Sequence, residues 1–589
     1  MRNMKSTISL LLAFSLLLAL AACGTAVPSD TASALSEAPS AAESAASGAD
    51  NAAEAPAAEP AEAPEAPEPE ASLVEEEPEL TPPGPVSLPL TENGESFSFW
   101  VDGAAPFVTM YLGSGESYNT AACTEYLESV TGVHIEYKEV SMFTATQEFA
   151  LMVASQDYTD MISNFANLYS GGYAQGLKDE VVLPVNDLVE TEMPYYKYYL
   201  DTHPEYLPDL VDDDGNMLFV SGFQDESFSM SGAAVRKDWL DKLGLDMPVT
   251  FDDWHDAALA FKDAYGITSP LCFTSAINPG LSFSRGYELP GFSLQWSDTF
   301  FFQKDGQVRA AYTEDRMKEF LKMLASWYKE GLLAPDFYSH NGGQDTEGDI
   351  VGGQVGFFWG DSAFIPTYNY MIEDPDCEIV GIQSPVLEEG QALHFSTANS
   401  FTGVNPVTIT TSCEDPELLA RWLDYHFTDE GRLLSNYGME GGSFEYNAAG
   451  EPEWNDFVRN NPDGLNFKQT TSTYILYATP SIFDADCNFE VLYGAEGTEA
   501  IRVYSAQEAD NTWAIPSNLS YSDEEADVLY ASGAISDLDT TAAEYILKFV
   551  TGSLDIDENW DAYVAAIEAL GLEDCIAAKQ GALDRYNAR

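Results

Sequence analysis

The sequence predicts an α/β fold built as two lobes. Stretches typical of strands and helices alternate over residues 105–163, an order that favours parallel strands joined by right-handed crossovers. Residues 96–589 also exceed the roughly 250–300 residues at which a single hydrophobic core stops growing. Amphipathic helices with clear start and stop signals continue to the end of the chain. Together these observations predict at least two α/β lobes.

The first 22 residues have the layout of a secretory signal peptide. Arg2 and Lys5 precede the apolar run 8–22, which is shorter than the roughly 20 residues that a spanning helix needs. A single transmembrane anchor is the alternative interpretation. The segment Leu20-Ala21-Ala22-Cys23 resembles the lipobox of bacterial lipoproteins, in which the cysteine receives a diacylglycerol and becomes the N-terminus. This resemblance implies that Cys23 is lipidated and that acyl chains such as palmitate anchor the chain.

Residues 24–95 are predicted to be a disordered tether. They contain 16 Asp or Glu and neither Lys nor Arg, and AEAPAAEPAEAPEAPEPEAS forms their centre. Low hydrophobicity and a single sign of charge cannot offset the conformational entropy that is lost on ordering. As a flexible coil the segment would reach roughly 45–50 Å. Such a tether would hold a domain clear of a membrane or within a cell wall.

The folded part begins with a predicted strand–helix–strand pattern. The segment APFVTMYLG (105–113) is typical of a buried strand, and 133–140 alternates apolar and polar residues with the period of a strand. A helix is expected between them, with Gly132 as its stop signal. A further short strand is predicted over 158–163.

The clearest helical block follows at residues 234–266. A short helix over 236–243 is expected to end at Gly244. Thr250 and Asp253 have the spacing of a capping box, which predicts the start of the next helix. Four apolar residues then share one helical stripe: Phe251, Trp254, Ala258 and Phe261.

The rest of the chain carries three further helices and one strand. Apolar residues recur at helical spacing over 313–335, and 352–364 is typical of a strand that leads into an exposed loop. A helix over 415–434 is expected to start with Pro416 at its first position. The stripe of apolar residues over 555–571 predicts another helix.

The charge of the chain excludes one class of partner. Its net charge is −72, and of the 97 acidic and 25 basic residues only 16 acidic and two basic ones precede residue 96. The folded part is therefore strongly acidic, which argues against nucleic acid as a partner. The charge also disfavours a strongly anionic ligand unless a local basic cleft exists.

No sequence motif predicts catalysis, a metal site or a cofactor. The six histidines show no paired-ligand spacing, and neither a phosphate-binding loop nor a G-x-S-x-G motif is present. The segment DDDGN (212–216) is predicted to be a turn, because Leu210 and Ser221 would occupy the carboxylate positions of a calcium loop. Six cysteines besides Cys23 have no C-x-x-C spacing, so disulfides and free thiols both remain open.

Several segments together resemble one protein family. They are VRKDWLDKLGLDMPVTFDDW, MLASWYKEGLLAPDF, QVGFFWGD, DPELLARWLDYHFTDEGRLLSNYGMEG and NWDAYVAAIEALGLEDCIAAKQGALDRY. By their order and spacing the chain resembles an extracellular solute-binding lipoprotein of a bacterial ABC importer, in the family 1 group related to carbohydrate binders. The resemblance implies a type-2 periplasmic-binding fold, in which two α/β lobes enclose an interlobe cleft and the chain crosses between them at hinges.

The resemblance also suggests where the lobes divide. A hinge is expected near residues 221–233, and the chain is expected to return near 401–407. The resulting assignment is a signal peptide over 1–22, the lipidated Cys23, the tether over 24–95, lobe I over 96–225 plus 400–445, and lobe II over 226–399 plus 446–589.

Ligand contacts are predicted from aromatic and polar residues in loop-like contexts. Five tryptophans are expected to be core residues instead: Trp239, Trp254, Trp327, Trp422 and Trp560. Ligands of open α/β sheets bind beyond the carboxyl ends of strands, where an aromatic face can stack on a sugar ring. The predicted ligand-binding residues are Trp359, Asp361, Trp296, Tyr169, Asn164, Ser114 and Glu440.

The resemblance implies a binding protein rather than an enzyme. The expected function is capture of a solute, most simply an oligosaccharide, by closure of the lobes on the outer face of the cell membrane. The expected partners are the solute, a permease with its ATPase in trans, and the membrane through the lipid anchor, with the protein itself a monomer. Two alternatives remain, a surface enzyme acting on glycans and a surface binding or sensor protein without a transport role.

Overall fold

The computed structural model describes residues 80–102, 117–141, 144–273, 283–293, 298–337, 343–396, 398, 400–462, 465, 467–507 and 509–589. Residues 78–589 form one compact unit. The predicted signal peptide, Cys23, residues 24–79 of the predicted tether and the predicted strand over 105–113 lie outside the described residues.

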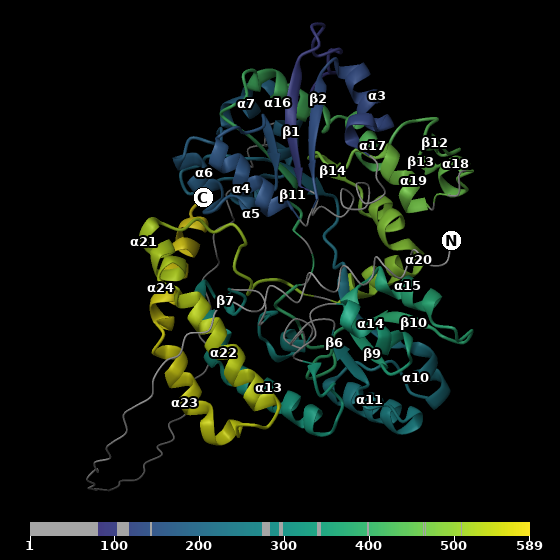
Figure 1. Ribbon diagram of the computed structural model, residues 1–589, viewed down its shortest axis with the longest axis vertical. Coiled ribbons are helices and arrows are strands. Elements are labelled where there is room, and N and C mark those ends of the chain that lie inside the picture. Colours follow the sequence, from purple (N-terminus) through teal and green to yellow (C-terminus); the bar gives the residue numbers. More distant parts are fainter. Residues whose placement is uncertain are drawn as a thin grey trace, which may run out of the picture. The chain divides into compact units, whose positions relative to one another are not determined.

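A mixed six-stranded sheet forms the centre of the first lobe. Its strands, in spatial order, are β14 (Ile482–Phe483), β4 (Val220–Gln224), β11 (Val404–Ile409), β3 (Met161–Ser163), β1 (Ser96–Asp102) and β2 (His134–Val140). β1 pairs in parallel with both β2 and β3, as the alternation of strands and helices predicts, whereas β11 runs antiparallel to β3 and β4. Figure 1 shows β1 and β2 side by side, with α3 next to them.

The helices of the first lobe bury apolar residues in its cores. They are α3 (Ala122–Thr131), α4 (Ala145–Ser155), α5 (Phe165–Leu168), α6 (Gly172–Lys178), α7 (Asn186–Glu192), α8 (Pro194–Thr202), α9 (Leu207–Leu210), α16 (Pro416–Tyr425), α17 (Asp429–Asn436), α18 (Asp456–Arg459) and α19 (Phe467–Tyr474). Gly132 ends α3 in the left-handed conformation, and a side chain there would collide with the carbonyl oxygen of Thr91.

The second lobe is built on a four-stranded sheet. Its spatial order is β10 (Ile379–Ile382), β5 (Ser231–Arg236), β9 (Phe357–Asp361) and β6 (Leu271–Phe273). The helices of this lobe are α10 (Lys237–Leu243), α11 (Phe251–Tyr265), α13 (Asp315–Lys329), α14 (Gly343–Val351), α15 (Phe364–Met371), α20 (Ala485–Ser505), α21 (Asp523–Ala526), α22 (Ala534–Val550), α23 (Ile556–Glu568) and α24 (Leu572–Tyr586). Figure 1 shows α13, α22 and α23 side by side, and their apolar faces share one core.

Two short antiparallel hairpins complete the strands. They pair β7 (Phe301–Lys304) with β8 (Gln307–Ala310) and β12 (Phe444–Tyr446) with β13 (Pro452–Trp454). The first hairpin matters for the site described below because Phe301 opens β7 and lines a cavity.

Local signals in the sequence are confirmed where they define helix ends. The Thr250 side chain accepts a hydrogen bond from the backbone N–H of Asp253, and the Asp253 carboxylate accepts one from the backbone N–H of Thr250 at 2.9 Å. This is the predicted capping box. Gly244 ends α10 in the left-handed conformation, also as predicted. The five tryptophans expected in the core are all buried.

The chain crosses between the two sheets three times. It leaves the first sheet after Gln224 and enters the second at Ser231, inside the segment 221–233 predicted to be a hinge. It returns after Ile382 and enters β11 at Val404, within the predicted return segment. The third crossing follows β14, because α20 packs its Ala500 and Tyr504 against the second sheet.

This third crossing departs from the predicted division of the lobes. β14 lies within residues 446–589, which were assigned to lobe II, yet it pairs in parallel with β4 of the first sheet. The backbone N–H of Phe223 donates to the carbonyl of Ser481 at 2.7 Å. Strand pairing of this kind depends on tertiary structure and leaves no local signal in a two-residue strand. The other lobe boundaries stay predictions.

The predicted tether also extends too far toward the fold. Residues 80–95 are described, and they contact the first lobe rather than forming part of a free spacer. The backbone N–H of Leu90 donates to the carbonyl of Thr131, and the Tyr195 hydroxyl donates to the carbonyl of Gly84. Leu90 packs against the core of the first lobe. The composition of residues 24–95 as a whole gives no indication of these few contacts near its end.

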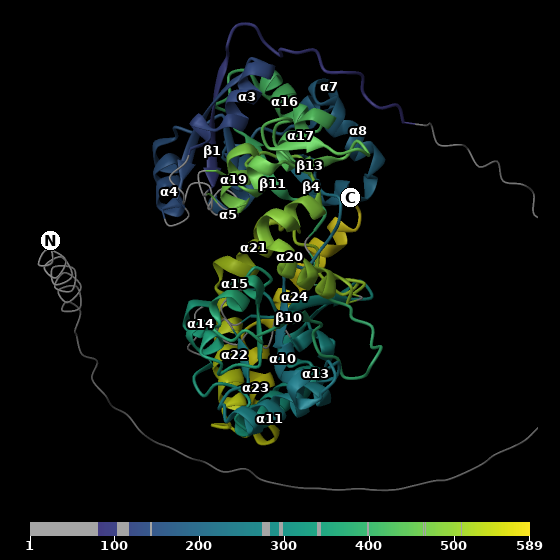
Figure 2. The ribbon, with the colours of Figure 1, turned by 90° about the vertical axis from the view of Figure 1, so that its right-hand side faces the viewer.

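The helix predicted over 415–434 is in fact two helices. α16 starts as predicted, with Asp415 as its cap and Pro416 in its first turn, but it ends at Tyr425. Thr428 then caps α17 by accepting a hydrogen bond from the backbone N–H of Gly431 at 3.0 Å. Figure 2 shows α16 and α17 close together in the first lobe. A second capping residue inside an apolar pattern therefore indicates that one helix ends and another begins there.

Candidate ligand-binding site

A cavity of about 570 Å³ opens at one edge of the second sheet. Ser231 begins β5 opposite Asp361, and Ala233 lies opposite Trp359, so the start of β5 and the carboxyl end of β9 meet at this edge. β6 runs parallel to β9 and ends at the same edge. The carboxyl ends of strands are the usual place for ligand sites in α/β folds.

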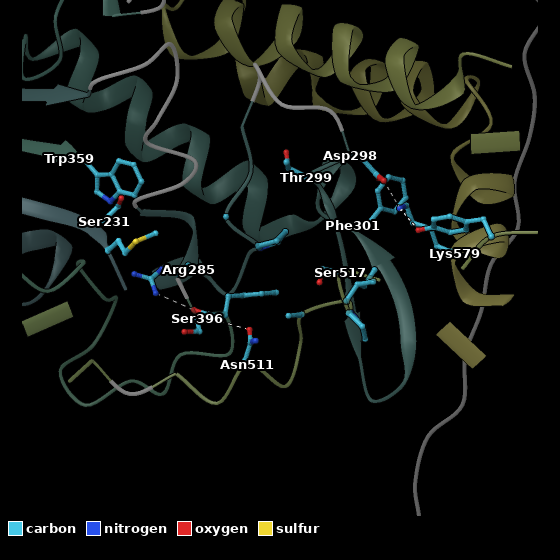
Figure 3. A pocket seen from close by; sticks show the side chains of 18 of the residues that line it. Ser231, Arg285, Asp298, Thr299, Phe301, Trp359, Ser396, Asn511, Ser517 and Lys579 are labelled. Carbon is cyan, nitrogen blue, oxygen red and sulfur yellow. Dashed lines mark hydrogen bonds and ion pairs between the residues drawn. The ribbon is translucent and has the colours of Figure 1, made fainter. Parts of the chain in front are cut away.

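The lining of this cavity combines aromatic rings with hydrogen-bonding groups. The aromatic residues are Phe301, Trp359, Phe395, Tyr521 and Tyr530. The uncharged polar residues are Ser231, Thr299, Ser396, Asn511 and Ser517. A volume of this size and a mostly apolar lining with a few polar groups are typical of small-molecule sites. Figure 3 shows Ser231, Arg285 and Trp359 on one side of the cavity and Asp298, Phe301 and Lys579 on the other.

Arg285 is the charged residue on the Trp359 side. It lies in the short 3₁₀ helix Ser284–Tyr287 and is 7% exposed. Its Nη1 donates to the carbonyl of Phe395 at 3.2 Å, and its Nη2 donates to the Ser384 hydroxyl at 3.0 Å. Its Nε has no hydrogen-bond partner. Burial lowers the pKa of the guanidinium to about 10, so it stays positively charged at neutral pH.

The opposite side carries a buried ion pair. Lys579 Nζ donates to the Asp298 carboxylate at 2.8 Å and to the Tyr521 hydroxyl at 3.1 Å, and Tyr530 donates to the same carboxylate oxygen of Asp298. Burial lowers the pKa of Lys579, but the charge of Asp298 and the hydrogen bonds outweigh it, so the net shift is upward. Asp298 Oδ1 is buried and has no hydrogen-bond partner.

A second cavity of about 600 Å³ adjoins the first. Three residues line both cavities: Ser517, Tyr521 and Tyr530. The second cavity is otherwise lined mainly by residues of the first lobe, among them Asn164, Tyr173 and Thr402. The ring of Tyr173 stacks on Phe219 with their centroids 4.7 Å apart, which presents a fixed aromatic surface. A ligand spanning both cavities would contact elements of both sheets.

The predicted site residues fall into three groups. Trp359 lines the first cavity and Asn164 lines the second. Asp361 accepts a hydrogen bond from the backbone N–H of Ala363 and is not among the residues that line either cavity, and Glu440 is exposed elsewhere. Trp296 and Ser114 lie outside the described residues. Contact of these residues with a ligand stays a prediction.

Tyr169 has a structural role that the sequence did not suggest. It is 9% exposed, its hydroxyl donates to Asp179 at 2.8 Å, and its ring stacks on Phe165. It lines neither cavity. Tyr173, four residues further along the same Gly-rich segment, lines the second cavity instead.

The three charged residues of the first cavity were missed. Arg285 and Asp298 are 13 residues apart, Lys579 lies 281 residues further along, and no known motif joins the three. One weak signal existed for Lys579, which lies among the buried residues Cys575, Ala578 and Ala582 of α24. A lysine on an apolar helical face needs a buried partner. Arg285 carried no signal beyond being one of only 25 basic residues.

Comparisons with known proteins decide the family. Residues 111–432 match the family of bacterial extracellular solute-binding proteins. The chain belongs to this family. Its members are binding proteins by name, and the two-lobed α/β fold agrees with that.

One relative and one solved structure match most of the chain, and a second relative matches about a third of it. The fructooligosaccharide ABC transporter substrate-binding protein FusA of Streptococcus pneumoniae serotype 4 is 24% identical over 502 residues, covering 80% of this chain and 88% of FusA. Lipoprotein LipO of Bacillus subtilis strain 168 is 25% identical over 233 residues, which are 36% of this chain and 43% of LipO. The solved structure of S. pneumoniae FusA in complex with kestose is 21% identical, with a TM-score of 0.61, and covers 84% of this chain and 100% of that one.

Further properties of the described residues bear on the site. Their histidines, cysteines and carboxylates form no group of three or more that could hold a metal ion. The segment 212–216 is the predicted turn, because Asp212 accepts hydrogen bonds from the backbone N–H groups of Asp214 and Asn216. The six cysteines after Cys23 are free thiols. Within the described ranges, no helix has the length and apolar composition to cross a membrane.

Proposed function

We propose that this chain is the substrate-binding component of an ABC importer and that it captures an oligosaccharide. The observation that carries the proposal is the first cavity, where Trp359 and Phe301 offer aromatic faces next to hydroxyl, amide and carboxylate groups. Sugar rings have one apolar face and a rim of hydroxyls, so they match such a lining. The family membership and the 80% coverage by FusA support the same function.

The mechanism is conformational. A ligand in the first cavity that also reaches Asn164 or Tyr173 in the second contacts both lobes. Such contacts are made fully only when the lobes are closed, so the ligand stabilises the closed state by its differential affinity. A permease with its ATPase then recognises the closed form. The chain itself has no phosphate-binding loop, so ATP hydrolysis belongs to the partner.

A glycan panel tests this function. Purified protein from residue 24 onward is expected to melt at a higher temperature with at least one oligosaccharide. A ligand present at 100 times its dissociation constant adds about 2.7 kcal/mol to the free energy of unfolding. Differential scanning calorimetry measures the shift, and an unrelated monosaccharide serves as the control. A broad panel without any shift would contradict the oligosaccharide part of the proposal.

The same samples separate binding from catalysis. We propose that the protein breaks no bond in its ligand, since the sequence offers no nucleophile or histidine motif. Chromatography of the bound glycan after prolonged incubation is expected to return it unchanged. Release of shorter glycans would favour the surface enzyme, and a genomic neighbourhood without permease genes would favour the sensor.

We further propose that Cys23 is lipidated and holds the protein as a monomer on the outer face of the cell membrane. The lipobox-like segment before Cys23 and the partial similarity to LipO support this anchor. A Cys23→Ser variant is expected to leave the membrane fraction for the medium, because two acyl chains supply most of the membrane affinity. Cell fractionation measures the distribution, with the internal Cys377→Ser variant as control. Equal membrane retention of both variants would refute lipidation.

A further inference from the structure

We infer that the ligand carries a negatively charged oxygen group on one of its sugars and that Arg285 binds this group. The inference rests on the proposed function, because it narrows the class of oligosaccharide. It commits to a single acidic group rather than a polyanion, since the chain as a whole has a net charge of −72. A carboxylate, a sulfate ester and a phosphate ester share this chemistry.

The first argument is that Arg285 is buried without a counterion. Its two hydrogen bonds go to neutral acceptors, the carbonyl of Phe395 and the hydroxyl of Ser384. No ion pair joins it to a carboxylate in the described part of the chain, and burial alone accounts for its lowered pKa. A guanidinium has five N–H donors, and these two bonds use two of them, while the Nε–H is buried without a partner.

The other buried cations of the described residues behave differently. Arg236 is 5% exposed, and its Nε and Nη2 donate to the two carboxylate oxygens of Asp238, each at 2.8 Å. Lys579 is 3% exposed and pairs with Asp298. Among the described residues, each buried lysine or arginine is therefore paired with a carboxylate, except Arg285. Burying a charge without a partner is costly, so this exception points to a partner outside the chain.

The second argument is the position of Arg285. It lines the first cavity next to Ser231 and Trp359, and Figure 3 shows these three on one side. The remaining charged pair of the cavity, Asp298 and Lys579, neutralises itself on the other side. Arg285 therefore gives the cavity a net positive charge in a chain of net charge −72. This is the local basic site that an acidic ligand would require.

Guanidinium geometry selects the ligand group. Arginine presents N–H donors in a planar fork that matches the oxygens of a carboxylate, sulfate or phosphate. With Trp359 stacked on a sugar ring, the acidic substituent of that ring or of the next one would lie within reach of the cavity wall. A neutral hydroxyl could accept one bond from Arg285 but would leave its charge uncompensated.

Matched pairs of glycans test the inference on the purified protein from residue 24 onward. The acidic members are 6′-sialyllactose, a xylotetraose bearing one glucuronate, lactose 6′-sulfate and lactose 6′-phosphate. Their neutral partners are sialyllactose methyl ester, plain xylotetraose and lactose. Isothermal titration calorimetry is expected to show at least one acidic glycan binding at least tenfold more tightly than its neutral partner. The arm that responds identifies carboxylate, sulfate or phosphate.

Substitutions of Arg285 test whether this residue causes the preference for an acidic glycan. Arg285→Gln is expected to weaken binding of the acidic glycan at least tenfold and to remove most of its advantage over the neutral partner. Arg285→Lys should restore part of the loss, because it returns the charge without the fork. Arg309→Gln removes an equal charge from an exposed ion pair with Glu314, outside the cavity, and should change nothing.

The outcomes are distinguishable. If a neutral glycan binds and no acidic one is preferred, the inference is wrong and the proposed function stands. If no glycan of either kind binds, the proposed function fails and the inference fails with it. If Arg285→Gln does not fold, the preference of the unmodified protein for an acid over its methyl ester decides alone.

Discussion

Relative to an Asp424→Asn variant, the free energy of unfolding of the protein is expected to fall as pH rises from about 4 to about 7. Asp424 lies in α16 and is 3% exposed. Its carboxylate accepts hydrogen bonds from the backbone N–H groups of Tyr196 at 2.8 Å and Tyr195 at 3.3 Å, at the start of α8. No lysine or arginine in the described ranges forms an ion pair with it.

Burial raises the pKa of Asp424 from 3.8 to about 7, although the two backbone hydrogen bonds lower it in part. Between these two values the folded state holds a proton that the unfolded state has lost. Stability therefore falls as pH rises through this window, and below it the contribution is fully present. At about 1.36 kcal/mol per pKa unit, the whole effect is at most about 4 kcal/mol.

Urea unfolding at intervals between pH 4 and pH 8 measures this prediction. Asparagine keeps an oxygen for the Tyr196 N–H but cannot ionise, so the difference between variant and unmodified protein should grow with pH. Parallel curves for the two proteins would contradict the raised pKa.

Asp238→Asn is the matched control with the opposite sign. Burial raises the pKa of Asp238, but hydrogen bonds from Arg236 and Lys242 outweigh it, so the pKa is lowered. Its contribution to stability is present above the ordinary carboxyl pKa and is lost as pH falls through the lowered value. The variant should therefore be least stable, relative to the unmodified protein, at neutral pH.

Replacing Trp359 with alanine is expected to weaken binding of the cognate glycan about 30- to 100-fold. Trp359 lines the first cavity from the end of β9 and is only partly buried. Loss of a central tryptophan at a binding site typically costs about 2–3 kcal/mol. Isothermal titration calorimetry measures the change in dissociation constant.

Conservative and distant variants make the Trp359 result interpretable. Trp359→Phe keeps an aromatic face and should retain much of the affinity. Tyr370→Ala removes an aromatic ring that is 91% exposed on α15 of the same lobe and should leave binding unchanged. An unaltered dissociation constant for Trp359→Ala would remove this residue from the site, whatever the glycan.

The α/β class and many element boundaries could be predicted because their causes are local. The capping box of Thr250 and Asp253 and the left-handed Gly132 and Gly244 each act within one turn of helix, so a few neighbouring residues suffice to recognise them. The alternation over 133–140 gives the buried face of β2 directly. Prediction from local patterns failed over residues 415–434, where one apolar pattern spans two helices. Thr428 caps the second helix, α17, and so separates it from α16.

The sequence by itself therefore determined the kind of protein: a two-lobed solute-binding fold, with Trp359 placed at a strand end where the structure has a cavity. Only the tertiary structure decided which charges meet there. Arg285, Asp298 and Lys579 are brought together by the packing of segments almost 300 residues apart, and their burial is a property of that packing. Residue type sets which bonds a side chain can make, but the folded environment decides whether a charge finds its partner in the chain or must find it in a ligand.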